Sequence, residues 1–349
     1  MTQSQFVPSI LLTFAVAATS CAPDDLPGGP GTGSDVGPGV PGVPGVATGA
    51  FALRHDVAPA RYEDLGANRP PYLAGADYPD FAPVAHFSYR DAAGDRVDGT
   101  GVLVHPRYVL TAAHNLASDG ERPRDPRASD MAVAFGTDFE APTLRIAVEA
   151  AFLHPAWLPN EAAGIESGVD LAVLRLARAV DLVPSPIDTA GAVRVGATLY
   201  ACGFGDLSAA LGRDGYSRRR AFANVVDRDV DGLRTPRAFP GEDRYAGGLI
   251  ACDFDSPAGD ANVLANGDAR AGDLPEVVAL GAGVSTAQPL PLEGTSAPGD
   301  SGGPAYVRCA AGWCVAGVVS SGTTDSDYGD VAIFTRVSSH REWLRAVLR

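Results

Sequence analysis

Short apolar runs, separated by Gly, Pro and Asp, dominate the chain from residue 51 onward. They are PVAHFSY at 83–89, GTGVLVHPRYVLT at 99–111, MAVAFG at 131–136, LRIAVEAAFLH at 144–154, LAVLRL at 171–176, ATLYACGFG at 197–205, CVAGVVSSG at 314–322 and VAIFTRV at 331–337. Short strands broken by turn residues at regular spacing predict an all-β sandwich or barrel. At the end of the chain, Trp343, Leu344 and Val347 have helical spacing, which predicts a C-terminal helix at about 337–349.

Two segments depart from this pattern. Residues 22–50 consist mainly of Gly, Pro and small residues, and such a composition cannot bury enough apolar surface to fold. We therefore expect a Gly/Pro-rich tether at 21–50. Residues 206–248 are polar and Gly-rich and predict long surface loops, in which the arginine run at 217–220 forms a solvated face.

The first twenty residues contain an uncharged apolar stretch at 6–19 that is too short to span a membrane comfortably. Its length predicts a signal peptide at 1–20, although no basic residue precedes it. Small residues before Cys21 resemble a bacterial lipoprotein signal, in which that cysteine is lipidated. Cleavage of an ordinary signal peptide nearby is the alternative. Either interpretation predicts export, as a membrane-anchored lipoprotein or as a secreted protein.

The charge balance narrows the choice of partners. The formal net charge is −15, which argues against nucleic acid and anionic membrane surfaces as partners. We expect a monomer, with a lipid anchor at Cys21 where that cysteine is lipidated. The 349 residues allow one large domain or two small ones after the tether.

Four cysteines remain when Cys21 is set aside, and an exported chain can pair them. Cys309 and Cys314 flank the residues AAGW, which could turn a hairpin, so this local pair is favoured. Cys202 and Cys252 would then pair by elimination, although four cysteines permit three pairings. No Cys-x-x-Cys or histidine cluster accompanies them, so we expect no metal.

Three residues carry candidate chemistry. Ser301 lies in GDSGGP at 299–304, where glycines permit a tight turn that exposes a nucleophile. His114 follows a predicted strand, and an imidazole there could act as a general base. Asp170 precedes an apolar strand and could orient that imidazole.

In this order, LTAAH at 110–114, DLAVLRL at 170–176 and GDSGGP resemble the trypsin-like serine protease family over residues 51–349. The resemblance implies two antiparallel β-barrels packed face to face with the active site in their cleft. They would span about 51–187 and 188–336. The resemblance also implies protein or peptide substrates, no cofactor, and a triad of Ser301, His114 and Asp170. The N–H groups of Gly299 and Ser301 would form the oxyanion hole.

Departures from the family pattern concern the scaffold and the substrate pocket. Asn115 and Ala297 stand where many members have cysteines. Thr295 occupies the pocket base, where an Asp would favour Arg or Lys, so the chain is expected to cut after neutral residues. Gly322 would leave the pocket mouth open and Ala332 would narrow the pocket. The backbones of Ser320 and Gly322 would pair with the substrate strand.

Three further hypotheses arise from the sequence. Asp325, Asp327 and Asp330 lie in a nearby loop and could restore a preference for cationic substrates. Processing between residues 47 and 53 could free the domain and order the oxyanion loop through Asp300. An inactive binding protein on this fold, or an esterase or acyltransferase with the same triad, are the alternative functions.

Overall fold

The computed structural model describes residues 52–91, 94–117, 130–157, 168–207, 217–231, 247–266, 280, 285–322 and 326–349. All of these residues belong to one of the chain's two compact units, residues 43–349. The predicted signal peptide, Cys21 and the tether lie outside the described residues. Among the helices within these ranges, none is both long and apolar enough to cross a membrane.

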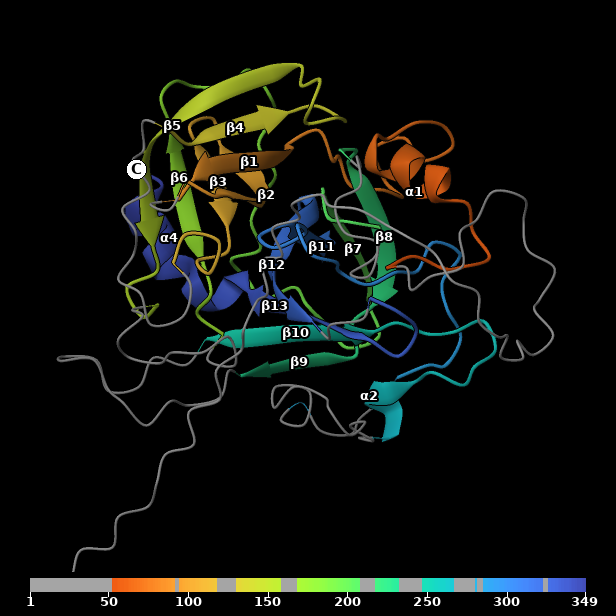
Figure 1. Ribbon diagram of the computed structural model, residues 1–349. Helices are drawn as coiled ribbons and strands as arrows, with labels where there is room; N and C mark the ends of the chain where they lie inside the picture. The colour runs from red at the N-terminus through yellow and green to blue at the C-terminus, as the bar shows by residue number, and fades with distance from the viewer. Residues whose placement is uncertain are drawn as a thin grey trace, which may run out of the picture. The chain divides into compact units, whose positions relative to one another are not determined.

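Six strands form a closed antiparallel barrel in the first part of the unit (Figure 1). The order around the barrel is β1-β2-β3-β6-β5-β4, and alternating inward-facing side chains such as Phe87, Leu103 and Val133 fill the interior. The strands are β1 (Val84–Arg90), β2 (Arg96–His105), β3 (Tyr108–Thr111), β4 (Ala132–Phe135), β5 (Leu144–Leu153) and β6 (Ala172–Leu176).

Seven strands form the second sheet, in the order β8-β7-β11-β12-β13-β10-β9. They are β7 (Thr198–Gly203), β8 (Arg220–Val225), β9 (Arg228–Asp231), β10 (Gly248–Asp253), β11 (Pro304–Cys309), β12 (Gly312–Gly322) and β13 (Val331–Arg336). Its end strands β8 and β9 do not pair with each other, so the sheet is an open half-barrel. One apolar cluster contains Val102 and Leu110 from the first barrel and Val318 and Phe334 from this sheet, so the two halves share a core.

Within the described ranges, helical segments are few and short. They are α1 (Pro59–Gly66), α2 (Val263–Asn266), the 3₁₀ turn η3 (Val337–His340) and α4 (Arg341–Val347). After β13 the chain returns to the first barrel, where Tyr108 Oη donates a 2.8 Å hydrogen bond to the carbonyl of Arg349. The predicted all-β fold class and C-terminal helix are thus confirmed.

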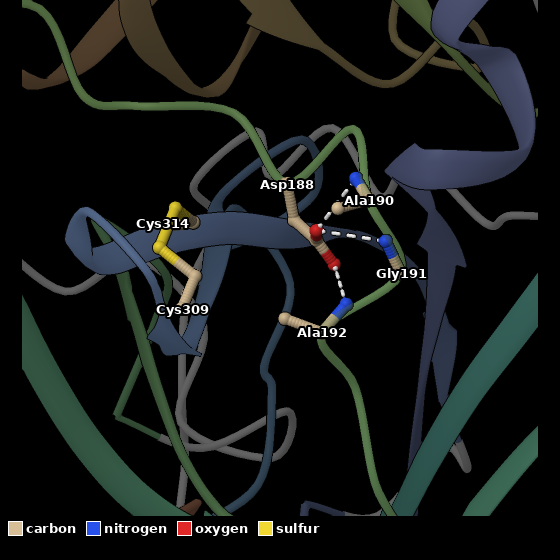
Figure 2. The surroundings of a disulfide bond; sticks show 6 residues. All are labelled: Asp188, Ala190, Gly191, Ala192, Cys309 and Cys314. Carbon is tan, nitrogen blue, oxygen red and sulfur yellow. Dashed lines mark hydrogen bonds between the residues drawn. A yellow bond between two sulfur atoms is a disulfide. The ribbon is translucent and has the colours of Figure 1, made fainter.

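Asp188 stabilises the connection between the two halves by hydrogen bonds, and a disulfide of the second sheet lies nearby (Figure 2). The Asp188 carboxylate accepts hydrogen bonds from three successive backbone N–H groups, those of Ala190, Gly191 and Ala192, at 3.1, 2.9 and 2.6 Å. Its own N–H donates to the carbonyl of Val315 in β12. The neighbouring residue of that strand is Cys314, which forms the predicted disulfide with Cys309 across the β11–β12 turn.

The second predicted disulfide is wrong. Cys202 and Cys252 are both buried and unpaired. Cys202 lies in β7 and Cys252 in β10, and three strands lie between β7 and β10 in the sheet order.

The expectation of surface loops at 206–248 is also wrong for the described part of that range. Residues 220–225 and 228–231 form β8 and β9, and β8 packs beside α1 (Figure 1). Arg219 and Arg220 are 4 % and 6 % exposed, so only Arg218 of the arginine run is solvated as predicted. Arg219 donates to the carbonyls of Gly66 and Val84, and these bonds satisfy its buried guanidinium.

Candidate active site

His114 and Asp170 meet because the strands beside them pair. Thr111 at the end of β3 lies opposite Ala172 at the start of β6, so the residues just beyond these positions converge. His114 Nδ1 lies 2.7 Å from Oδ2 of Asp170, and the backbone N–H of His114 donates to Oδ1 at 2.9 Å. Both carboxylate oxygens therefore hold the histidine.

Asp170 is fully buried, yet its carboxylate has several partners. A third donor, the Ser320 hydroxyl of β12, reaches Oδ2 at 2.6 Å. Burial acts to raise the pKa of Asp170, but the charge of His114 and the hydrogen bonds from His114 and Ser320 outweigh it. The pKa is therefore lowered and the carboxylate stays ionised.

Ser301 lies on a tight turn that only glycine neighbours permit. Gly299 has φ +97° and Gly302 has φ +84°, a region that residues with a Cβ rarely adopt. The N–H of Asp300 donates to the carbonyl of Ala297, and the N–H of Gly302 donates to the carbonyl of Val319. The turn is thus hydrogen-bonded to β12 of the second sheet.

Two N–H groups of this turn have no acceptor within the part of the chain that the structure describes, those of Gly299 and Ser301. Their carbonyls, in contrast, are both bonded to Thr100, Gly299 through the Thr100 hydroxyl and Ser301 through the Thr100 N–H, each at 2.9 Å. The two N–H groups are available to an anionic oxygen.

No hydrogen bond joins the Ser301 hydroxyl to the ring of His114 among the described residues. The link between them runs instead through Asn115, which follows His114 and donates from Nδ2 to the carbonyl of Ser301 at 3.0 Å. Catalytic hydrogen bonds are often long before substrate binds, so this geometry is compatible with proton transfer in a complex.

Asp300 anchors the turn from the buried side. Its carboxylate accepts hydrogen bonds from the N–H groups of Gly205 at 2.7 Å and Ala297 at 3.0 Å. Burial raises the pKa of Asp300, opposed by the charge of Arg220 and by the two N–H groups. Arg220 also donates to the carbonyl of Gly205, so this glycine lies between the guanidinium and the carboxylate.

A pocket of about 230 Å³ opens beside Ser301. Among the described residues that line it, none is charged and three carry hydroxyl groups besides Ser301. They are Ser296, Ala297, Pro298, Ser301, Val319, Ser321, Gly322 and Ser326.

Of the four residues predicted to bind substrate, only Gly322 lines this pocket. Thr295 and Ala332 are 2 % and 0 % exposed and lie behind the pocket wall. Ser320 is buried too, with its hydroxyl on Asp170. A Cβ at Gly322 would lie 3.1 Å from the carbonyl of Val331, so a side chain there would crowd the pocket wall.

Sequence reasoning missed that Ser296, Ser321 and Ser326 line the pocket. It also missed the hydrogen bonds of Ser320 to Asp170 and of Asn115 to Ser301. The serines next to Thr295 and Gly322 were visible in the motifs, but alternation along the strand decides which neighbour faces the cavity. For Asn115 the signal was present, because the residue departs from the family's usual cysteine.

Comparison with known proteins agrees with the architecture. Residues 99–261 match the family described as trypsin-like peptidase domain, a range that contains His114 and Asp170 and ends before Ser301. The chain is similar to the CLIP domain-containing serine protease B10 of Anopheles gambiae, with 26 % identity over 304 residues, covering 82 % of this chain and 69 % of that protein.

A shorter similarity, 29 % identity over 154 residues, relates the chain to the inactive CLIP domain-containing serine protease A3 of Aedes aegypti. It covers 39 % of this chain and 31 % of that protein. With the barrel and half-barrel described above, these similarities support a trypsin-like serine protease.

Proposed function

We propose that the chain hydrolyses peptide bonds with Ser301 as nucleophile, His114 as general base and Asp170 as its orienting partner. Ser301 Oγ attacks the scissile carbonyl carbon while the His114 ring takes the hydroxyl proton. The resulting oxyanion is bound by the N–H groups of Gly299 and Ser301. As the C–N bond breaks, His114 gives the proton to the leaving amine, and water then hydrolyses the acyl-enzyme by the reverse proton path.

The observation that carries this proposal is the 2.7 Å contact between His114 Nδ1 and Asp170 Oδ2. A buried, ionised carboxylate on Nδ1 selects the tautomer whose other ring nitrogen can accept a proton, and it stabilises the imidazolium formed during reaction. The two acceptor-free N–H groups of the Ser301 turn supply the second requirement, donors for a developing oxyanion.

The substrate residue before the cut is proposed to be neutral. The described residues that line the pocket beside Ser301 are uncharged, and their hydroxyl groups tolerate small polar as well as apolar side chains. Asp327 and Asp330 are not among its lining residues. Asp325, which could also favour a cation, lies outside the described residues.

Export remains part of the proposal. The Cys309–Cys314 disulfide supports it, because disulfides form and persist in oxidising compartments. A signal peptide at 1–20, lipidation of Cys21 and a protease domain at 51–349 complete this hypothesis, with a monomer acting on protein or peptide substrates.

Processing before residue 53 is a further part of the hypothesis. Ala52 and Leu53 are each 3 % exposed, and the Ala52 carbonyl accepts a hydrogen bond from the N–H of Thr295 at 2.9 Å. A cut just upstream would leave this buried segment in place behind the pocket. N-terminal sequencing of active protein tests the idea, and full activity of a chain that keeps its tether would refute it.

Labelling with a fluorophosphonate probe tests the nucleophile. The full chain should form a covalent adduct that maps to Ser301, whereas Ser301→Ala should not label. Ser185→Ala is the matched control and should label like the wild type, because Ser185 bonds Tyr306 in the interior, outside the site. A folded wild type that is not labelled would favour the alternative function, that of an inactive binding protein on this fold. One protein similar to this chain, from Aedes aegypti, is described as inactive.

A fluorogenic peptide panel then tests the substrate class. Turnover should be fastest with a small or medium neutral residue before the cut, and a clear optimum at Arg or Lys would refute the neutral pocket. The same acyl-transfer chemistry also serves esterases. Comparison of matched peptide and ester substrates separates the two, since an esterase would leave the peptide intact.

A further inference from the structure

Asn115 connects the turn that carries His114 to the turn that carries Ser301. Its Nδ2 donates to the backbone carbonyl of Ser301 at 3.0 Å and to Thr111 Oγ1 at 3.3 Å. The residue is 7 % exposed, and its own carbonyl accepts a 2.7 Å hydrogen bond from Tyr89 Oη. A buried amide with an anchored backbone thus spans from the first barrel to the turn that leads into β11.

Gly99 provides the space for this side chain. A Cβ at Gly99 would lie 2.9 Å from Nδ2 of Asn115 and 3.1 Å from its Cγ, closer than ordinary van der Waals contact. The next residue, Thr100, donates its backbone N–H to the same carbonyl of Ser301 at 2.9 Å. Two donors from the first barrel therefore converge on one oxygen of the second half.

We infer that Asn115 is a positioning residue for Ser301, an inference that rests on the proposed function. A carbonyl oxygen has two lone pairs, and here both have donors, Thr100 N–H and Asn115 Nδ2. The peptide plane between 301 and 302 cannot rotate without losing these bonds. Its orientation sets the direction of the Ser301 side chain and N–H relative to the first barrel, which carries His114.

The consequence is expected in the chemical step rather than in binding. Displacement of a reacting atom by 1 Å can cost about a hundredfold in rate, and Thr100 retains part of the restraint when Asn115 is lost. We therefore expect kcat to fall about five- to tenfold in Asn115→Leu, a substitution of similar size without a donor. KM should change less than about twofold, since Asn115 does not line the pocket.

Asn68→Gly is the matched control for a general loss of stability. Asn68 Nδ2 also donates to two acceptors, the carbonyls of Tyr72 and Pro79 at 3.1 and 2.8 Å, in the connection between α1 and β1. Its φ of +51° suits glycine, so the substitution removes the side-chain bonds without backbone strain. Both variants should melt at a lower temperature than the wild type, but only Asn115→Leu should lose kcat.

Amide hydrogen exchange of the peptide covering 297–303 gives a readout that does not depend on activity. Exchange at this peptide should be faster in Asn115→Leu than in the wild type and unchanged in Asn68→Gly. Equal kcat values for the two variants within twofold, or unchanged exchange in Asn115→Leu, would overturn the inference. If the folded wild type fails to label with the fluorophosphonate probe, the proposed function fails, and the exchange comparison still decides whether Asn115 holds the turn.

Discussion

The hydroxyl of Ser320 donates a 2.6 Å hydrogen bond to Oδ2 of Asp170, the same oxygen that His114 Nδ1 contacts at 2.7 Å. Ser320 belongs to the second sheet and Asp170 to the first barrel, so one buried carboxylate joins both halves to the histidine. Ser320→Ala removes a donor from a buried charge, and such a bond contributes about 1.5–3 kcal/mol. We expect kcat/KM on a peptide substrate to fall by about tenfold or more.

Ser185→Ala serves as the control for this substitution. Ser185 is buried as well, and its hydroxyl bonds Tyr306 Oη at 2.9 Å, away from the candidate triad. It should lower the melting temperature without lowering kcat/KM. An equal activity loss in the two variants would show that the Ser320 bond has no specific part in catalysis.

The strands that the sequence predicted are mostly apolar, and charged residues such as Arg145 and Arg175 occur in them singly. β8 was missed because it begins at Arg220, the last residue of an arginine run, and β9 because its sequence RDVD is mostly charged. The buried arginines are stabilised by backbone carbonyls of distant segments, such as those of Gly66 and Val84 for Arg219. Such partners are invisible to a local pattern, which therefore indicated surface loops.

The candidate site was likewise predicted only in part from the sequence. The resemblance of three motifs to the trypsin-like serine protease family implied that His114 and Asp170 meet, and the pairing of β3 with β6 brings them together. Pocket lining depends on finer alternation along the chain, and Ser296 rather than its neighbour Thr295 faces the cavity. Elimination among cysteines failed because it assumes that every cysteine is paired, and Cys202 and Cys252 are both free.

Chemical modification can test whether Cys202 and Cys252 are free thiols, as in the structure, or form the disulfide predicted from the sequence. Burial raises the pKa of Cys202 to about 12 and that of Cys252 well above its ordinary value, so neither supplies a reactive thiolate. We expect iodoacetamide to leave both unmodified in the folded chain and to modify both after denaturation without reductant. Peptide mass spectrometry reads the result, with Cys309 and Cys314 as the disulfide-bonded control. Protection that persists in denaturant until reductant is added would restore the predicted disulfide.

Three buried carboxyl groups, those of Asp227, Asp255 and Glu293, make stability depend on pH. Burial and the charge of Asp253 raise the pKa values of Asp227 and Asp255 to about 8, and that of Glu293 to about 7. Unfolded, these groups titrate near pH 4, so the folded state binds more protons between about pH 4 and 8. Their stabilisation is complete below pH 4 and is lost as pH rises through 7 to 8. The melting temperature should therefore fall between pH 5 and 8.

Asp255→Asn isolates the origin of that fall. Asp255 is 5 % exposed and its Oδ1 has no hydrogen-bond partner within the described residues, so an amide of the same shape removes only the charge. The variant should have a flatter pH profile and melt higher than the wild type at pH 8. Asp181→Asn, at an exposed position, should leave the profile unchanged. A wild-type melting temperature that is level or rises from pH 5 to 8 would contradict the assignment.

Gly205→Ala tests how strictly the buried side of the nucleophile turn is packed. The N–H of Gly205 bonds Asp300, and a Cβ there would lie 2.5 Å from Cγ of that aspartate. Asp300 cannot move away freely, because the N–H of Ala297 also holds its carboxylate. Overpacking of this kind costs about 1–3 kcal/mol, and the displacement would reach Ser301, the next residue.

We expect Gly205→Ala to lower both the melting temperature and the rate of fluorophosphonate labelling, the latter by about tenfold or more. Gly75→Ala is the control, because no atom lies within 4 Å of a Cβ at Gly75. Its labelling rate should match that of the wild type. Equal labelling by the two variants would mean that the turn adjusts around Asp300, and the arrangement of Gly299 and Ser301 would then not depend on packing at this carboxylate.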